Sequence, residues 1–228
     1  MATDTGGRGG LAGAIGPALI LGVVTAVAVA FLAFIHATTA ARIAANERAF
    51  ILRNLDDLLP RSEYDNDPLA DIVYGFDPEL LGRGQPSAIW RVRREGKPVA
   101  AVLQPITPHG YSGDIALLVA ITVDGDLLGV RVTSHRETPG LGDAIERRRG
   151  DWILSFDGRS LVDPGAEGWG VRRDGGIFDE FTGATVTPRA VVSGVYKALQ
   201  YFALHGEQIF EAPTGTSLAP TRLPESVP

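Results

Sequence analysis

The N-terminal part of the sequence contains a run from Gly9 to Ala41 without any Asp, Glu, Lys or Arg. A helix that spans a membrane needs about 20 apolar residues at a rise of 1.5 Å each, and the apolar part, Leu11 to Ile35, supplies that length. A cleaved signal peptide, the alternative, has an apolar region of only about 7–15 residues. We therefore predict a retained transmembrane helix over residues 11–36, preceded by an N-terminal tail of residues 1–10.

The sequence after this anchor changes from a helical to a strand-like pattern. Apolar residues at spacings of three and four predict a helical extension over residues 37–60, which ends where Pro60 opens a polar segment. Strand-like segments follow at residues 88–93, 98–103, 115–123 and 127–132, and Asp124-Gly125-Asp126 predicts a hairpin turn between the last two. These patterns predict an α+β fold with a mostly antiparallel sheet and flanking helices.

Two further helices are expected beside the sheet. Residues 143–156 have an amphipathic pattern. A stronger signal runs from Thr187 to His205, with Thr187 as the N-cap, Pro188 in the first turn and Gly206 beyond the end. We therefore place the folded domain at residues 61–211. Residues 212–228 are rich in proline, and we expect a C-terminal tail that is disordered or docked as an extended strand.

Composition excludes several classes of site. The chain has no cysteine, which excludes disulfides, cysteine-ligated iron–sulfur clusters, CxxCH haem attachment and thiolate zinc sites. Its four histidines lack the local spacing of a metal-ligand pair, and a net charge of −6 offers no basic face to nucleic acid. P-loop, complete GxGxxG and GxSxG motifs are absent from the sequence. We therefore predict no metal ligand and no catalytic residue.

A cluster of threonines precedes the last predicted helix, in the stretch DEFTGATVTP at residues 179–188. N-capping accounts for Thr187, but it does not account for Thr182 or Thr185. The Gly183-Ala184 pair presents almost no side chain, so a bulky group can approach the Thr185 hydroxyl.

The position of Thr185 before a helix suggests what that group could be. Helix N-termini favour phosphate through their unpaired N–H groups and the helix dipole, and Arg189 in the first turn can add a charge-assisted contact. The residues themselves leave two interpretations open, a phosphate site and an ordinary capped loop.

The pattern Asp-x-x-Thr-Gly-Ala-Thr within this cluster resembles the flavinylation motif of the FMN-binding domain family, Asp-x-x-Ser/Thr-Gly-Ala-Thr. In that family FMN is esterified through its phosphate to the last threonine, so the resemblance implies Thr185 as the acceptor. It also implies that a flavin transferase makes the bond and requires the other fixed positions. This sequence has threonine where serine is commoner and Phe181 where a smaller residue is frequent. The fixed positions here are Asp179, Thr182, Gly183 and Ala184.

Two glycine-rich segments upstream extend the resemblance. Residues 110–115 and 134–142 are similar to the family's Gly-Tyr-x-Gly and His-x-Glu-Thr-Pro-Gly-Leu-Gly segments. Taken alone, they read as glycine-rich β-turns. With the resemblance, we expect the second segment to pack against the flavin, since glycines let backbone N–H groups approach a planar ring closely. The remaining cofactor-binding residues expected are Glu137, Thr138, Gly140, Leu141, Gly142, Thr187 and Arg189.

Within this family, the chain is similar in length and in its single anchor to the G subunits of Rnf-type complexes, which couple ferredoxin and NAD redox chemistry to sodium or proton translocation. The similarity implies a membrane-anchored flavoprotein that relays electrons through covalent FMN. It would be the electron-transfer subunit of a multisubunit translocase, with other membrane subunits as partners. Two alternatives stay open: the C subunit of a sodium-pumping NADH:quinone oxidoreductase, which is usually longer, and a flavinless membrane-anchored scaffold.

The resemblance and the charge pattern disagree on topology. Arg8 stands alone before the span, while Arg42, Arg48 and Arg53 follow it, which by the positive-inside rule favours a cytoplasmic C-terminal domain. Members of the family carry this domain on the periplasmic side of the inner membrane. We follow the family, because charge bias is statistical and a span bound by partners need not obey it.

Overall fold

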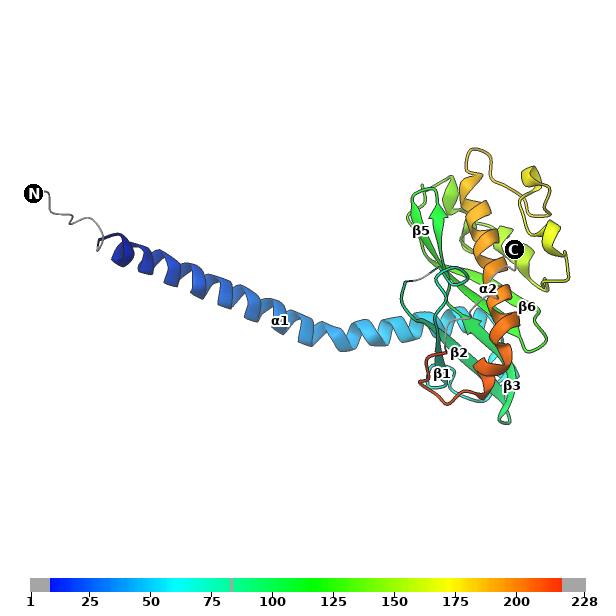
Figure 1. Cartoon of the computed structure of the whole chain (residues 1–228), viewed down its shortest axis with the longest axis horizontal. Coiled ribbons are helices and arrows are strands. Elements are labelled where there is room, and N and C mark those ends of the chain that lie inside the picture. Colours follow the sequence, from blue (N-terminus) through cyan, green and yellow to red (C-terminus); the bar gives the residue numbers. More distant parts are fainter. Residues whose placement is uncertain (1–8, 83, 219–228) are drawn as a thin grey trace, which may run out of the picture. The chain divides into compact units, whose positions relative to one another are not determined.

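The structure is a computed structural model that describes residues 9–82 and 84–218, and it divides into two compact units after Leu52. The first unit consists of most of a long N-terminal helix. The second is a folded domain with a six-stranded antiparallel sheet and a second long helix (Figure 1). The helices are α1 (Gly9–Leu58) and α2 (Val186–Glu211), and the strands are β1 (Ile72–Gly75), β2 (Ser87–Arg94), β3 (Lys97–Leu103), β4 (Ile106–Gly110), β5 (Gly113–Thr122) and β6 (Leu127–Ser134).

Helix α1 contains a segment suited to a membrane. Leu19–Ala40, 22 residues, is long and apolar enough to cross one, and its side chains are exposed. Near its end the Thr38 and Thr39 hydroxyls donate to carbonyl oxygens one turn back, so these polar groups are satisfied inside the helix. Helix α1 therefore fits a single-pass membrane anchor. The segment starts and ends later than the predicted span at residues 11–36.

The last turn of α1, from Arg53, belongs to the folded domain. Leu55 and Leu58 are buried there, as is Leu59 just beyond the helix. Arg131 on β6 donates a hydrogen bond to the Asp57 carbonyl oxygen at 3.1 Å. The helix thus ends at Leu58 by packing into the domain, two residues before the predicted end at residue 60, and Pro60 prevents its continuation.

The sheet has the order β1-β2-β3-β5-β4, and β6 pairs with the other edge of β5. Strand β5 is ten residues long, and it pairs with β3 through residues 119–122 and with β4 through residues 113–116. The β5–β6 hairpin turns at Gly125, whose φ of 91° favours glycine. The predicted antiparallel sheet and this hairpin are confirmed.

The sequence pattern did not reveal β1 and β4. Strand β4 reads ITPHG, and its proline and glycine break the alternation that marks a strand. It forms because it pairs with the first half of β5. Tertiary pairing therefore overrides a weak local preference.

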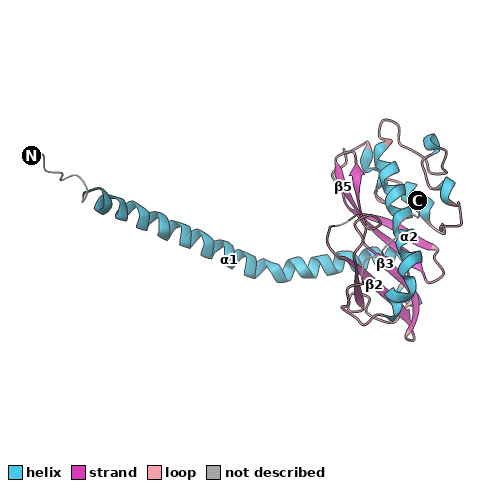
Figure 2. Ribbon diagram, viewed as in Figure 1, coloured by secondary structure: helices cyan, strands magenta, loops and turns pink. Residues whose placement is uncertain are grey.

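Helix α2 lies across one face of the sheet (Figure 2) and contributes a large part of the core. Its fully buried residues Val191, Val195 and Ala198 recur at helical spacing and pack with apolar residues of the central strands, such as Leu103 and Leu117. This packing fixes the position of the helix N-terminus, where the threonine cluster ends.

Two helix predictions need correction. Residues 143–156 do not form one helix but the short 3₁₀ helices η2 (Gly142–Ile145) and η3 (Trp152–Phe156). The intervening turn lets Ile145, Ile153 and Phe156 all reach the core. Three further 3₁₀ helices are described: η1 (Arg61–Glu63), η4 (Ala166–Gly168) and η5 (Arg172–Asp174).

Helix α2 also differs from its prediction at both ends. Thr185, not Thr187, occupies the N-cap position, and the helix continues through Gly206 to Glu211. Ile209, beyond Gly206, is fully buried. Burying such a side chain contributes about 1.5–3 kcal/mol, which outweighs the cost of about 1 kcal/mol for glycine in a helix.

The described part of the C-terminal tail is docked. Tyr74 on β1 donates its N–H to the Thr216 carbonyl oxygen at 2.9 Å, and the Leu218 N–H donates to the Tyr74 carbonyl oxygen at 2.7 Å. This matches one of the two predicted alternatives, an extended strand. Residues 219–228 of the predicted tail, like residues 1–8 of the predicted N-terminal tail, lie outside the described residues.

Candidate functional site

The loop that carries the threonine cluster is held in place by aromatic contacts. The Trp152 Nε1–H group donates a hydrogen bond to the Asp179 carbonyl oxygen at 2.8 Å, and the Phe181 ring packs edge-on against Trp152 at 5.2 Å between centroids. Gly183 has φ of 83°, which lets the Ala184 N–H turn back to the Phe181 carbonyl oxygen at 3.0 Å. This turn places Thr185 at the N-terminus of α2.

Thr185 is half-buried at the N-cap of α2, a helix of 26 residues. Its hydroxyl makes no capping hydrogen bond and has no protein hydrogen-bond partner among the described residues. The first unpaired N–H groups of the helix and its dipole favour a negative group at this position. Thr185 therefore presents an unpaired hydroxyl where a phosphate is electrostatically favoured.

A cavity of about 230 Å³ opens beside Thr185. Among the described residues of the folded domain, eight large hydrophobic side chains are exposed, and three of them line this cavity. Tyr111 is 73% exposed, Leu141 47% and Val186 40%. Exposed apolar side chains gathered around a cavity typify a ligand site.

A buried carboxylate joins the walls of the cavity. Glu137 is only 4% exposed; it accepts the Ser112 N–H at 2.9 Å through Oε1 and the Thr187 hydroxyl through Oε2. Gly142 lies against this pair: a Cβ there would come within 2.9 Å of Glu137 Oε2 and 3.0 Å of Thr187 Oγ1. Glu137 thus ties the hairpin after β4, its own glycine-rich loop and the start of α2 together.

A second set of hydrogen bonds, made by His135 and Glu146, holds the backbone of Glu137. Its N–H donates to His135 Nδ1 at 3.0 Å, so Nε2 of the same ring carries the proton and donates to Glu146 Oε1 at 2.7 Å. Hydrogen bonds from Arg148, then from His135, outweigh the effect of burial and lower the pKa of Glu146 to about 2. The ion pair and the imidazole therefore fix the loop that carries Glu137.

The ion pair between Glu146 and Arg148 makes the stability of the fold at acid pH depend on Glu146. Its pKa is depressed in the folded protein, so its contribution to stability is complete above pH 4.5 and is lost as the pH falls towards about 2. We expect Glu146→Gln to flatten the fall in unfolding free energy over that pH range, measured by urea titration at several pH values. Glu211→Gln, which removes a carboxylate without an ion pair among the described residues, serves as the control. Equal slopes for both variants would contradict the assignment.

The structure brings together most, but not all, of the predicted site residues. Four lie elsewhere: Asp179 pairs with Arg172 at 2.9 Å, Arg189 pairs with Asp174 at 2.6 Å, and neither Thr182 nor Gly140 lines the cavity. No group of His, Asp or Glu able to hold a metal occurs in residues 9–82 and 84–218. The predicted residues that line the cavity are Glu137, Thr138, Leu141, Gly142, Gly183, Ala184, Thr185 and Thr187.

Two cavity residues were not predicted. Tyr111 lies in the Gly-Tyr-x-Gly segment, and an aromatic residue between two glycines was the available signal. Val186 lies between the two threonines that drew attention to the loop. Both expose apolar surface, which only the folded chain reveals.

Comparison with known proteins agrees with this geometry. The model of the FMN-binding domain matches residues 110–200, and that of the RnfG N-terminal region matches residues 14–58. Proteins named as G subunits of an ion-translocating oxidoreductase complex are similar over most of their length. The one from Pseudomonas aeruginosa is 50% identical over 84% of this chain and 90% of its own. That from Vibrio cholerae is 42% identical over 86% and 93%, and that from Cereibacter sphaeroides 45% over 84% and 85%. The chain belongs to the family of these G subunits and carries their FMN-binding domain.

Proposed function

We propose that this chain is the flavin-carrying subunit of an Rnf-type ion-translocating oxidoreductase complex, in which it holds FMN as a phosphoester on Thr185 and relays electrons. The observation that carries the proposal is the unpaired Thr185 hydroxyl at the N-terminus of α2, beside a cavity with apolar walls. FMN, when bound, supplies the redox chemistry that side chains lack. The chain is then an electron-transfer component of a translocase.

The start of α2 suits the phosphate. The Arg189 N–H makes the first intrahelical hydrogen bond, to the Thr185 carbonyl oxygen at 3.3 Å. The preceding N–H groups of Val186 and Thr187 therefore point out of the helix end, and they favour negative charge. Pro188 has no N–H to leave unpaired. A phosphoester on Thr185 thus gains backbone donors without displacing a side-chain hydrogen bond.

The cavity walls suit a planar aromatic ring. Tyr111, Leu141 and Val186 present apolar surface on three different segments. Contact with a flavin would remove that apolar surface from water, which would stabilise the bound state by about 25 cal/mol for each Å² buried. Glu137, which is buried, would hold these segments in their relative positions through its hydrogen bonds with Ser112 and Thr187.

The remaining residues of the motif suit recognition by a maturation enzyme. Thr182 and Gly183 are exposed, and the Asp179 side chain is 65% exposed. A flavin transferase could reach all three on the surface of the loop. Of the three, only Gly183 lines the cavity. Arg189 would have to leave Asp174 to meet the phosphate; the hydrogen bond from Arg189 lowers the pKa of Asp174 and favours the existing pair.

We place the folded domain on the periplasmic side of the inner membrane, with α1 as its anchor. A covalent link suits that location, because FMN lost outside the cytoplasm could not readily be replaced. The partners are the other membrane subunits of the complex.

Peptide mass measurement tests the proposal. Trypsin should release residues 174–189, which contain Thr185, and we expect this peptide to carry the mass of FMN less one water. Protease added to intact spheroplasts should cleave the domain if it faces the periplasm. An unmodified peptide from protein made beside an active flavin transferase would refute the phosphoester, and protection from protease would refute the topology.

A further inference from the structure

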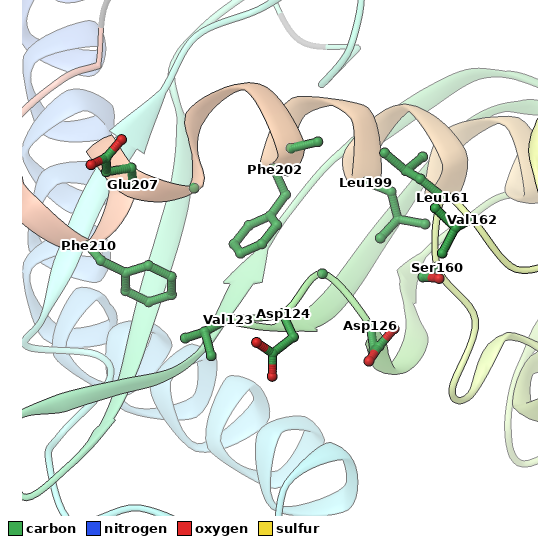
Figure 3. Close-up of a pocket in the computed structure, with 13 residues that line it drawn as sticks. Val123, Asp124, Asp126, Ser160, Leu161, Val162, Leu199, Phe202, Glu207 and Phe210 are labelled. Atoms are coloured by element: carbon green, nitrogen blue, oxygen red, sulfur yellow. The ribbon is translucent and has the colours of Figure 1, made fainter.

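A second cavity, of about 510 Å³, lies in the folded domain (Figure 3). Its walls are the β5–β6 hairpin at residues 123–126, the loop at residues 160–162, and the C-terminal half of α2. Leu199 and Phe202 of α2 lie buried at its base, and Ala203 and Gly206 of the same helix carry too little side chain to fill it. None of its lining residues lines the cavity beside Thr185. We call it the hairpin groove.

Apolar surface is exposed at the edge of the hairpin groove. Val162 is 88% exposed and Val123 44%. With the three residues beside Thr185, these make five of the eight large exposed hydrophobic side chains described in the folded domain. Such apolar exposure at a concave surface marks a binding site for a ligand or a protein.

The rim of the hairpin groove is negatively charged. Asp124 and Asp126 on the hairpin and Glu207 on α2 are exposed (Figure 3), and none forms an ion pair with a described residue. Elsewhere in the domain, carboxylates such as Asp71, Glu146 and Asp174 are paired with arginines. The three rim carboxylates are therefore available to an incoming cation.

We propose that the hairpin groove docks a segment of another subunit of the same complex, one that carries a large apolar side chain flanked by lysine or arginine. The apolar side chain would enter between Val123, Val162 and Phe202, and the cations would meet the rim. A second copy of this chain is a poor fit, because its net charge is −6. The identity of the partner as a subunit rests on the proposed function, whereas the geometry of the groove does not.

Site-specific crosslinking tests the occupant. We would place a photoreactive amino acid at Ala203, inside the groove, in the full-length chain in native membranes. The control is the neighbouring Leu204, which is 50% exposed and does not line the groove. We expect the crosslinked peptide from Ala203 to come from another membrane subunit and to contain basic residues around an apolar one. Crosslinking to a second copy, to a peptide without basic residues, or equally from both positions would overturn the proposal.

Charge reversal tests the rim. We expect the pair Asp124→Lys and Glu207→Lys to lower the amount of this subunit that co-purifies with the complex roughly tenfold or more, because like charges would then face each other across the interface. Glu211→Lys, outside the groove on the same helix, should leave it unchanged. The flavin on Thr185 is measured by peptide mass in the same samples. Its presence in a charge-reversed variant shows that the variant domain has folded, and its presence in the unmodified chain tests the proposed function. Unchanged co-purification would overturn the proposal even if the flavin is present, and absence of flavin from the unmodified chain would refute the phosphoester alone.

Discussion

Replacing Thr185 by valine is expected to abolish covalent flavin completely and to leave the fold intact. The hydroxyl is the only group in this position that can form the ester, and valine keeps the branched shape. The hydroxyl has no hydrogen-bond partner among the described residues, so its removal should change the unfolding free energy by no more than about 0.5 kcal/mol.

Flavin fluorescence of the denatured protein on a gel measures this loss, and circular dichroism during heating measures the fold. Thr185→Ser restores the hydroxyl without the methyl group, and we expect it to regain part or all of the fluorescence. Thr182→Val, which removes an exposed hydroxyl outside the cavity, separates recognition by the transferase from attachment. Fluorescence that survives denaturation in Thr185→Val would mean that another residue carries the flavin.

The fold was predictable where local patterns and tertiary packing agree. The strands at residues 88–93, 98–103 and 127–132 lie within β2, β3 and β6, and the hairpin turn at Gly125 follows from local chemistry. Strand β4 was missed because its local sequence opposes the strand that its partner imposes. Residues 143–156 were predicted as one helix because apolar spacing does not show that an intervening turn can serve the core equally well.

The site was predictable in its residue types but not in their hydrogen bonds. Thr187 looks like an N-cap by position, yet its hydroxyl is fully buried and donates to Glu137, 50 residues earlier. Local capping rules could not anticipate this partner, because it comes from another loop. Thr185, the motif's last threonine, occupies the N-cap position, yet its backbone is helical (φ −66°, ψ −29°) rather than extended as in most capping residues, and its hydroxyl makes no capping hydrogen bond. The apolar walls likewise depend on packing between distant segments.

Glu137 and Thr187 form a hydrogen-bonded pair that is buried between two loops and the start of α2. We expect Glu137→Ala to lower the unfolding free energy by about 3–6 kcal/mol, since it removes two hydrogen bonds to a charged group, worth about 1.5–3 kcal/mol each, and leaves the Thr187 hydroxyl buried and unpaired. Thr187→Val should cost about 1–3 kcal/mol, because the carboxylate then keeps only the Ser112 N–H. Both variants should also shift the flavin spectrum, because the segments around the cavity lose the hydrogen bond between Glu137 and Thr187 that connects them.

A double-mutant cycle separates this pair from general destabilisation. The cost of Glu137→Ala with Thr187→Val should fall short of the sum of the single costs by about 0.5–3 kcal/mol, since each single variant already breaks the shared bond. Ser87→Ala is the matched control: its buried hydroxyl donates to the Gln104 carbonyl oxygen at 2.6 Å, outside the cavity. It should destabilise the fold, add to Glu137→Ala within about 0.5 kcal/mol and leave the flavin spectrum unchanged. Simple additivity of Glu137→Ala and Thr187→Val would show that the two side chains do not act as a pair, and the cavity would then need another source of its shape.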